Sequence, residues 1–247
     1  MDSLRRFSAG SANDENYKEL WVKGASLIID QFNSLSKFNN YNISIIDISY
    51  FNNNFSNNLK SVLDRNGSDK ANSHNYNIVY AHILNILGIN NNLNILEVGL
   101  GTNNPSLISS MGSGGIPGAS LYSWREYLPN SDIYGADIDK NILFQSSSIK
   151  TSFVDQLDIN TFTLMQNTFG NPKYDLIIDD GLHSIGANFN TLLFALDNVK
   201  TGGWIVIEDI LIIDNWFTID YILSNNKAYK TYIVKCARSY IYVVNKL

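Results

Sequence analysis

The pattern of hydrophobic and polar residues changes near residue 92. Before it, apolar residues recur mainly at helical spacing, which predicts helices over about 15–36, 58–64 and 74–87. The segment 43–51 is rich in β-branched residues and fits either a strand or a loop. Beyond residue 92, continuous apolar runs alternate with helical segments. The predicted strands are 93–99, 131–138, 149–155, 174–180 and 203–209, and the predicted helices are 118–128, 158–168 and 187–199.

Apolar strands that alternate with helices indicate a parallel sheet covered by helices on both faces. The tail, residues 229–245, has two apolar runs separated by CARS (236–239), which predicts a closing antiparallel hairpin. We therefore expect an α/β fold with a Rossmann-like, doubly wound, mostly parallel sheet. The expected domains are an N-terminal, mostly helical extension over 1–66 and a Rossmann-like domain over 67–247.

Composition excludes several classes of protein. The 247 residues are 45% hydrophobic and 17% charged, so the chain can bury a large core. A formal net charge of −5 argues against a nucleic-acid partner, which needs a basic face. The single cysteine, Cys236, excludes a disulfide framework and a multi-cysteine zinc site. The chain has no apolar run of membrane-spanning length and no signal-peptide pattern, so we expect a cytoplasmic protein without a membrane partner.

The ends of the first two strands after residue 92 carry residues that can bind a ligand. In a doubly wound sheet, ligands lie beyond the carboxyl ends of the strands. The first of these strands ends in Glu97, Gly99 and Gly101, and the glycines allow a ligand to approach the backbone closely. The third glycine of a dinucleotide fingerprint is missing, because position 104 is Asn104. Asp137, at the end of the next strand, can accept both hydroxyls of a ribose.

Two of these assignments have alternatives that the residues alone leave open. Asp155 and Gln156 follow the strand 149–155 and can either contact an adenine or cap the next helix. Glu97 fits a site beside a cationic ligand, and it equally fits a solvated carboxylate at a strand end.

The last two strands before the tail end in acidic residues. If these strands are neighbours, their ends lie about 5 Å apart, and Asp180, Glu208 and Asp209 converge. Three carboxylates at one point repel one another unless a cation lies among them, and oxygen ligands favour Mg²⁺, Mn²⁺ or Ca²⁺. His183 follows closely and could take a proton from a bound hydroxyl, because imidazole titrates near ~6.5. As an ordinary loop histidine it would instead bond to the backbone.

Taken in order, these motifs resemble the class I S-adenosylmethionine-dependent methyltransferases. They are EVGLG (97–101), YGADID (134–139), FVDQLD (153–158), YDLIIDDGLH (174–183) and GGWIVIED (202–209). The pairing of DDGLH with IED is similar to that in the metal-dependent sugar O-methyltransferases of macrolide biosynthesis. GSDKANSHNYNIVY (67–80) is similar to the segment that precedes the core of those enzymes. The resemblance covers roughly residues 67–210.

The resemblance implies S-adenosyl-L-methionine and Mg²⁺ (or Mn²⁺) as cofactors and a hydroxyl of a sugar or glycosylated metabolite as acceptor. It implies that the cofactor is bound by Glu97, Gly99, Gly101, Asp137, Asp155, Gln156 and Asp179, the metal by Asp180, Glu208 and Asp209, with His183 as general base. Ala71 replaces the usual glycine after Asp69-Lys70, and the long segment 103–118 also departs from the pattern, which leaves the acceptor's identity open. The N-terminal helices could cover the site or form a homo-oligomer contact.

Three other functions stay open on the sequence. A metal-independent methyltransferase would act on another small molecule and keep its activity in EDTA. An NAD(P)-dependent nucleotide-sugar reductase or epimerase would need a full Gly-x-Gly-x-x-Gly and a Tyr-x-x-x-Lys pair, which the candidate helices lack. A catalytically inactive cofactor-binding protein would have no need for the set of Asp180, His183, Glu208 and Asp209.

Overall fold

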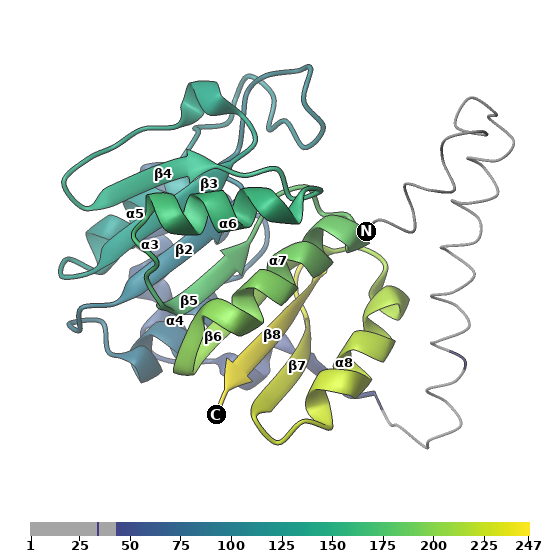
Figure 1. Cartoon of the computed structure of the whole chain (residues 1–247). Coiled ribbons are helices and arrows are strands. Elements are labelled where there is room, and N and C mark those ends of the chain that lie inside the picture. Colours follow the sequence, from purple (N-terminus) through teal and green to yellow (C-terminus); the bar gives the residue numbers. More distant parts are fainter. Residues whose placement is uncertain (1–33, 35–42) are drawn as a thin grey trace, which may run out of the picture. The chain divides into compact units, whose positions relative to one another are not determined.

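The computed structural model describes Ser34 and residues 43–247 of the chain (Figure 1). Apart from Ser34, the helix predicted over 15–36 lies outside the described residues. The chain divides into two compact units. One comprises Ser44–Leu211 and Leu223–Leu247 and contains all the candidate site residues. The described part of the other includes residues 212–222, with the 3-10 turn η3 (Ile213–Trp216) and the start of helix α8 (Phe217–Ser224).

An eight-stranded sheet forms the centre of the larger unit, in the order β1-β7-β8-β6-β5-β2-β3-β4. The five strands from β6 to β4 are mutually parallel, and β8 runs antiparallel to both of its neighbours. The strands are β1 (Ile45–Asp47), β2 (Asn94–Val98), β3 (Asp132–Asp137), β4 (Ile149–Phe153), β5 (Tyr174–Asp179), β6 (Val199–Ile210), β7 (Tyr229–Lys235) and β8 (Tyr240–Lys246). The predicted α/β sheet with a C-terminal antiparallel hairpin is confirmed.

The segment 43–51, which the sequence left open, is a short strand followed by the 3-10 turn η1 (Ile48–Phe51). The strand, β1, pairs in parallel with β7 at the edge of the sheet, with Ile45 opposite Ile233. The larger compact unit begins at Ser44 and so includes β1, while the division into an N-terminal extension and a Rossmann-like domain at residue 66 stays a prediction. Three residues are too few for a period-two pattern to reveal such a strand.

Helices cover both faces of the sheet (Figure 1). They are α3 (Ser56–Asn66), α4 (Asn77–Leu87), α5 (Ala119–Tyr127), α6 (Ile159–Thr168) and α7 (Ile185–Asn198), with a 3-10 turn η2 (Lys140–Ile142) after β3. Helices α3, α4 and α5 pack together on one face, and α6 and α7 lie side by side on the other. No helix in the described part of the chain is long and apolar enough to cross a membrane.

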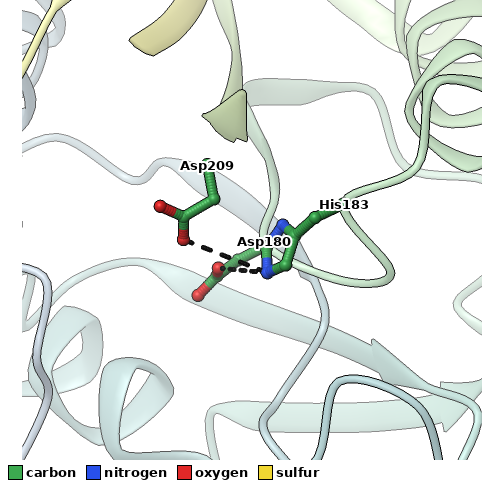
Figure 2. Close-up of side chains that lie close together, drawn as sticks. All are labelled: Asp180, His183 and Asp209. Atoms are coloured by element: carbon green, nitrogen blue, oxygen red, sulfur yellow. Dashed lines mark ion pairs between the residues drawn. The ribbon is translucent and has the colours of Figure 1, made fainter. Parts of the chain in front are cut away.

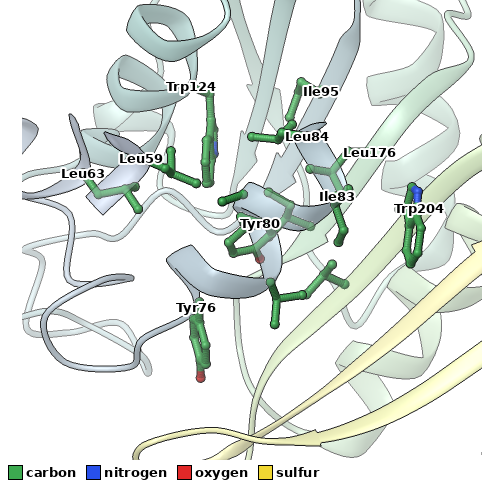
Figure 3. Packing of buried hydrophobic residues seen from close by; sticks show 14 of the residues in the cluster. Leu59, Leu63, Tyr76, Tyr80, Ile83, Leu84, Ile95, Trp124, Leu176 and Trp204 are labelled. Atoms are coloured by element: carbon green, nitrogen blue, oxygen red, sulfur yellow. The ribbon is translucent and has the colours of Figure 1, made fainter. Parts of the chain in front are cut away.

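A hydrophobic cluster fixes α3, α4 and α5 to the sheet (Figure 3). Tyr80 of α4 and Trp124 of α5 are fully buried, and their rings meet edge to face at 5.1 Å between centroids. Ile95 of β2 and Leu176 of β5 belong to the same cluster. Burial of each large apolar side chain contributes about 1.5–3 kcal/mol, so this cluster holds α4 firmly against the sheet.

Strand β2 lies between β5 and β3, where the strand order reverses. Gly99, directly after β2, has φ +96°, and a Cβ there would lie 2.0 Å from the backbone oxygen of Asp180. Only glycine allows the chain after β2 to pass this close to the end of β5. The sequence therefore places the β2 turn against the first residue beyond β5.

Candidate active site

A cavity of about 680 Å³ opens at the carboxyl ends of the parallel strands. Its size is typical of a small-molecule site. The predicted site residues that line it are Gly99, Gly101, Asp137, Asp155, Gln156, Asp180, His183 and Asp209. The three predicted residues that do not line it are Glu97, Asp179 and Glu208. Its position at the reversal of strand order is where doubly wound sheets bind ligands.

Asp137 is held rigidly on one side of the cavity. Its Oδ2 accepts a hydrogen bond from the Leu100 backbone N–H at 2.7 Å, and its Oδ1 accepts one from the Asp139 N–H at 2.8 Å. Burial raises the pKa of Asp137, although these backbone bonds favour its charged form. Each oxygen keeps capacity to accept a further hydrogen bond from a ligand hydroxyl.

Gln156 organises the wall of the cavity beyond β4. Its Nε2 donates to Asp179 Oδ1 and to Thr191 Oγ1, both at 2.8 Å, and its Oε1 accepts from the Leu182 N–H at 2.7 Å. Asp179 is fully buried and also accepts from Asn188 Nδ2 at 3.0 Å. Asp179 therefore does not line the cavity itself but fixes the position of Gln156, which does.

The alternative in which Asp155 or Gln156 caps the next helix is wrong. The N-cap of α6 is Asp158, whose side chain accepts a hydrogen bond from the Asn160 N–H at 3.0 Å. Both Asp155 and Gln156 line the cavity instead.

Glu97 lies beneath the cavity with no exposed surface, so the alternative of a solvated strand-end carboxylate is also wrong. Its Oε2 accepts a hydrogen bond from Trp124 Nε1 at 2.5 Å, and its Oε1 lies 3.2 Å from Lys70 Nζ. Burial raises the pKa of Glu97 even though the Lys70 ammonium opposes this. Its contacts tie the end of β2 to α5 and to Lys70.

Lys70 is the centre of a buried ionic cluster. Besides Glu97, its Nζ contacts Asp180 Oδ2 at 2.5 Å and Glu208 Oε2 at 2.8 Å, and only 2% of its side chain is exposed. Burial alone would lower the pKa of Lys70, but the three carboxylates outweigh it and raise that pKa well above its ordinary value. The hydroxyl of Tyr80 donates to the other oxygen of Glu208. Glu208 thus has a partner for each carboxylate oxygen.

Asp180, His183 and Asp209 are 22–29% exposed and line the mouth of the cavity. Figure 2 shows that their side chains converge. His183 Nε2 lies 3.8 Å from Asp180 Oδ1 and 3.9 Å from Asp209 Oδ2. One ligand atom from each of the three lies within 4.8 Å of the others. Strands β5 and β6 are neighbours, with Asp179 opposite Ile207, which is the condition that the sequence argument required.

The backbone at this point is unusual. His183 and Asp209 have φ of 54° and 53°, in the left-handed region that few residues other than glycine adopt. Such conformations persist where the surrounding structure enforces them, and they cluster at functional sites. His183 stands between the end of β5 and Ser184, the N-cap of α7, so the strand-to-helix turn directs its side chain.

Asp209 has three further partners on its Oδ1. Tyr76 Oη donates to it at 2.7 Å, Ser239 Oγ donates at 3.0 Å, and His74 Nδ1 lies 3.2 Å away. The carboxylates of Asp209 and Asp69 raise the pKa of His74 to about 10, so His74 is positively charged at neutral pH. Burial opposes ionisation of Asp209, but His74 and Tyr76 outweigh it and keep the pKa of that carboxyl below its usual range.

Sequence reasoning gave no role to five residues of this site. Four of them belong to the motif GSDKANSHNYNIVY, which the sequence marked as similar to a known segment without giving these residues a role. They are Lys70, His74, Tyr76 and Tyr80. The fifth, Ser239, lies in the turn between β7 and β8, and nothing local in the sequence marks it.

The residues at the mouth of the cavity fit a divalent cation. Asp180 Oδ1 and Asp209 Oδ2 both face His183 Nε2. Mg²⁺ is usually held by one or two carboxylates together with water or ligand oxygens, so these two carboxylates can hold it while the imidazole keeps its lone pair for a proton. His183 Nδ1 is buried and has no hydrogen-bond partner within residues 43–247.

The chain is similar in sequence to curated sugar O-methyltransferases, and no protein-family model matches it. It is 36% identical over 94 residues to mycinamicin VI 2''-O-methyltransferase of Micromonospora griseorubida, which is 38% of this chain and 23% of that protein. It is 35% identical over 94 residues to demethylmacrocin O-methyltransferase of Streptomyces fradiae, again 38% and 23% of the two chains. The chain spans under a quarter of the length of these relatives. The resemblance found from the motifs is confirmed.

A solved structure shares the fold. The MycE methyltransferase of the mycinamycin biosynthetic pathway, in complex with Mg, SAH and mycinamycin VI, aligns with a TM-score of 0.60 at 19% identity. The alignment covers 76% of this chain and 54% of that chain. The chain therefore has the fold of a class I methyltransferase, and the fold lends no support to the nucleotide-sugar reductase alternative.

Proposed function

We propose that the chain is an S-adenosylmethionine-dependent O-methyltransferase that uses a divalent cation, Mg²⁺ or Mn²⁺, to methylate a hydroxyl of a sugar or glycosylated metabolite. The observation that carries the proposal is a single cavity that joins the glycine turn and Asp137 to Asp180, His183 and Asp209. The sugar O-methyltransferases that the chain resembles, and the Mg and SAH in the MycE complex, support the same assignment.

The cofactor occupies the side of the cavity formed by the strand ends β2, β3 and β4. Gly99 and Gly101 pass beneath its methionine part, Asp137 accepts its ribose hydroxyls, and Asp155 and Gln156 flank its adenine. The support is that all five residues line the cavity and that Asp137 and Gln156 are fixed by backbone hydrogen bonds before any ligand binds. Such preorganisation lowers the ordering cost of binding.

The acceptor hydroxyl occupies the mouth of the cavity. Asp180 and Asp209 hold the cation there, which when bound supplies Lewis-acid stabilisation of negative charge on oxygen. His183 Nε2 would take the proton of the hydroxyl, and the oxygen would attack the sulfonium methyl carbon in line. The O–CH3 bond would form as the S–CH3 bond breaks, with S-adenosylhomocysteine as the leaving group. Because the cofactor and the acceptor share one cavity, positioning supplies much of the rate.

The acceptor is a small molecule on this proposal, and a nucleic-acid acceptor is disfavoured by the net charge of −5. The loop 103–118 forms one wall, with Leu107, Met111 and Ile116 lining the cavity. An apolar wall beside carboxylates suits an acceptor with both an apolar part and hydroxyl groups. Three assignments stay predictions: that Glu97 and Asp179 bind the cofactor, that Glu208 binds the metal, and that the chain forms a homo-oligomer.

Titration of S-adenosylhomocysteine by calorimetry, first with Mg²⁺ and then with EDTA, tests the proposal. We expect binding in both conditions, and at least about tenfold weaker binding to Asp137→Ala, which loses hydrogen bonds to a charged group. The matched control is Asp132→Ala, at the opposite, exposed end of β3. Absence of binding to the wild type would overturn the proposal. Methyl transfer that survives EDTA would instead favour the metal-independent alternative.

A further inference from the structure

Each of the two carboxylates at the mouth of the cavity has one oxygen already occupied. Asp180 Oδ2 contacts Lys70 Nζ at 2.5 Å, and its Oδ1 faces His183. Asp209 Oδ1 is approached by Tyr76, Ser239 and His74, and its Oδ2 faces His183. Among residues 43–247, no group donates a hydrogen bond to Asp180 Oδ1 or to Asp209 Oδ2. The same pattern therefore holds at the carboxyl ends of the neighbouring strands β5 and β6.

The groups that occupy these oxygens come mostly from one short segment, which we name the 69–76 clamp and which contains Lys70, His74 and Tyr76. The clamp is itself fixed. The Tyr76 N–H donates to the Lys70 carbonyl at 2.8 Å, and Tyr76 is the N-cap residue of α4, which the hydrophobic cluster holds in place. Asn75 Oδ1 also accepts from the Ala237 N–H at 3.0 Å, which ties the clamp to the turn that carries Ser239. The clamp therefore cannot move away from Asp180 and Asp209 without breaking these contacts.

We infer that the 69–76 clamp, together with Ser239, makes Asp180 and Asp209 one-oxygen ligands and thereby selects a small octahedral cation over Ca²⁺. Asp209 Oδ1 has two lone pairs and accepts from the hydroxyls of Tyr76 and Ser239, so a cation could use this oxygen only by displacing one of them. Asp180 Oδ2 carries the Lys70 ammonium, whose positive charge repels a cation from that oxygen. Ca²⁺ takes six to eight oxygens and commonly uses both oxygens of a carboxylate, whereas Mg²⁺ takes single oxygens in octahedral geometry. Lys70, His74, Tyr76 and Ser239 are therefore positioning residues. The inference rests on the proposed function.

Mn²⁺ and Ca²⁺ binding, measured separately by calorimetry, provides the test, because Mn²⁺ can stand in for Mg²⁺. The wild type is expected to prefer Mn²⁺. The double variant Tyr76→Phe/Ser239→Ala removes two hydroxyls from Asp209 Oδ1 and leaves the carboxylate in place. We expect its preference for Mn²⁺ over Ca²⁺ to fall by about fivefold, the equivalent of one net hydrogen bond.

Tyr174→Phe is the matched control. Tyr174 is fully buried like Tyr76, but it does not line the cavity, and its hydroxyl donates to Gln166 Oε1 at 2.8 Å. We expect the preference of this variant to stay within about twofold of the wild type, less than one hydrogen bond is worth. A merely structural role for Tyr76 would change stability, but it would not change the ratio of two affinities measured on folded protein. If the double variant does not fold, Tyr76→Phe alone must show a smaller fall in the same direction.

The outcomes separate this inference from the proposed function. An unchanged preference in the Tyr76 and Ser239 variants, or an equal fall in Tyr174→Phe, would overturn the clamp. Wild-type binding of S-adenosylhomocysteine and Mn²⁺ would still support the methyltransferase. A wild type that binds S-adenosylhomocysteine but neither cation would overturn the cation site and the clamp with it. A wild type that binds no S-adenosylhomocysteine would overturn the proposed function itself.

Discussion

His183 is the residue with the most specific chemical prediction. Its Nε2 lies between two carboxylates at the mouth of the cavity, and a general base contributes about 10²–10⁴-fold to a rate. We expect His183→Ala to lose turnover in that range while its affinity for S-adenosylhomocysteine stays close to that of the wild type. Methyl transfer assays with an identified acceptor, paired with calorimetry, measure both. Unchanged turnover would contradict the role of His183 as base.

Substitution of Lys70 is expected to have a large effect on the free energy of unfolding. Removal of one partner from a buried ion cluster leaves uncompensated charge and costs about 3–5 kcal/mol. Lys70→Met leaves three carboxylates without their ammonium, so we expect a large fall in the free energy of unfolding. Lys60→Met is the control, because the Lys60–Asp64 pair is 39% and 32% exposed and such pairs contribute about 0–1 kcal/mol. Urea denaturation of both variants measures the two losses in free energy of unfolding. Equal losses in Lys70→Met and Lys60→Met would contradict the prediction.

Single residues also show where prediction from the sequence stopped. Asp180 and Asp209 were predicted to meet because each ends a predicted strand, and neighbouring parallel strands end at one edge of a sheet. Lys70 could not be placed in the same way. Its partners Asp180 and Glu208 lie 110 and 138 residues further along the chain, and no local pattern states which carboxylate a lysine will reach. Buried pairing of this kind is decided by tertiary packing.

At the scale of elements, the junction between β2 and β5 depends on Gly99. A Cβ at Gly99 would meet the backbone of Asp180, and φ is +96°. Gly170 is a matched control, because its φ is +82° and a Cβ there would meet nothing within 4 Å. We expect Gly170→Ala to cost about 1–2 kcal/mol from its backbone conformation alone. Gly99→Ala should cost more and weaken binding of S-adenosylhomocysteine, as thermal unfolding and calorimetry would show; equal losses would contradict the close approach.

The contact between α4 and η1 predicts a dependence of stability on pH. His82 of α4 packs edge to face against Phe51, with 5.1 Å between ring centroids, and burial lowers the pKa of His82. Above its unfolded pKa of about 6.5, His82 is neutral in both states, so its protonation does not affect the free energy of unfolding. As pH falls through that value, the unfolded state takes up the proton first, so the folded state loses relative stability. Thermal unfolding from pH 7.5 to 5 should show a smaller decrease in Tm for His82→Gln; identical curves would contradict this.

The elements themselves were largely predictable. Every strand and helix expected after residue 92 is present, because buried parallel strands form continuous apolar runs that stand out from helical spacing. Strand β1 was not predictable as a strand, since it has three residues and pairs with β7, almost 190 positions later. The order of strands in the sheet also depends on long-range pairing. It was inferred from general rules for α/β folds rather than from particular residues.

For the whole molecule, binding and folding are linked, which gives a test that needs no acceptor. A ligand that binds only the folded state stabilises it by about 2.7 kcal/mol at one hundred times its Kd. For a protein of 150–250 residues, this corresponds to a rise in Tm of about 5–10 °C. We expect S-adenosylhomocysteine to produce this rise and Asp137→Ala to reduce it at the same ligand concentration.

A dinucleotide supplies the comparison for the same measurement. NADH carries an adenine and a ribose, but the turn after β2 lacks the third glycine of the dinucleotide fingerprint, and Asn104 stands there instead. We expect no comparable rise in Tm with NADH. A rise with NADH and none with S-adenosylhomocysteine would assign the cavity to a dinucleotide. A rise with S-adenosylhomocysteine that Mg²⁺ increases further would instead show that cofactor and cation bind the same folded state, which the shared cavity requires.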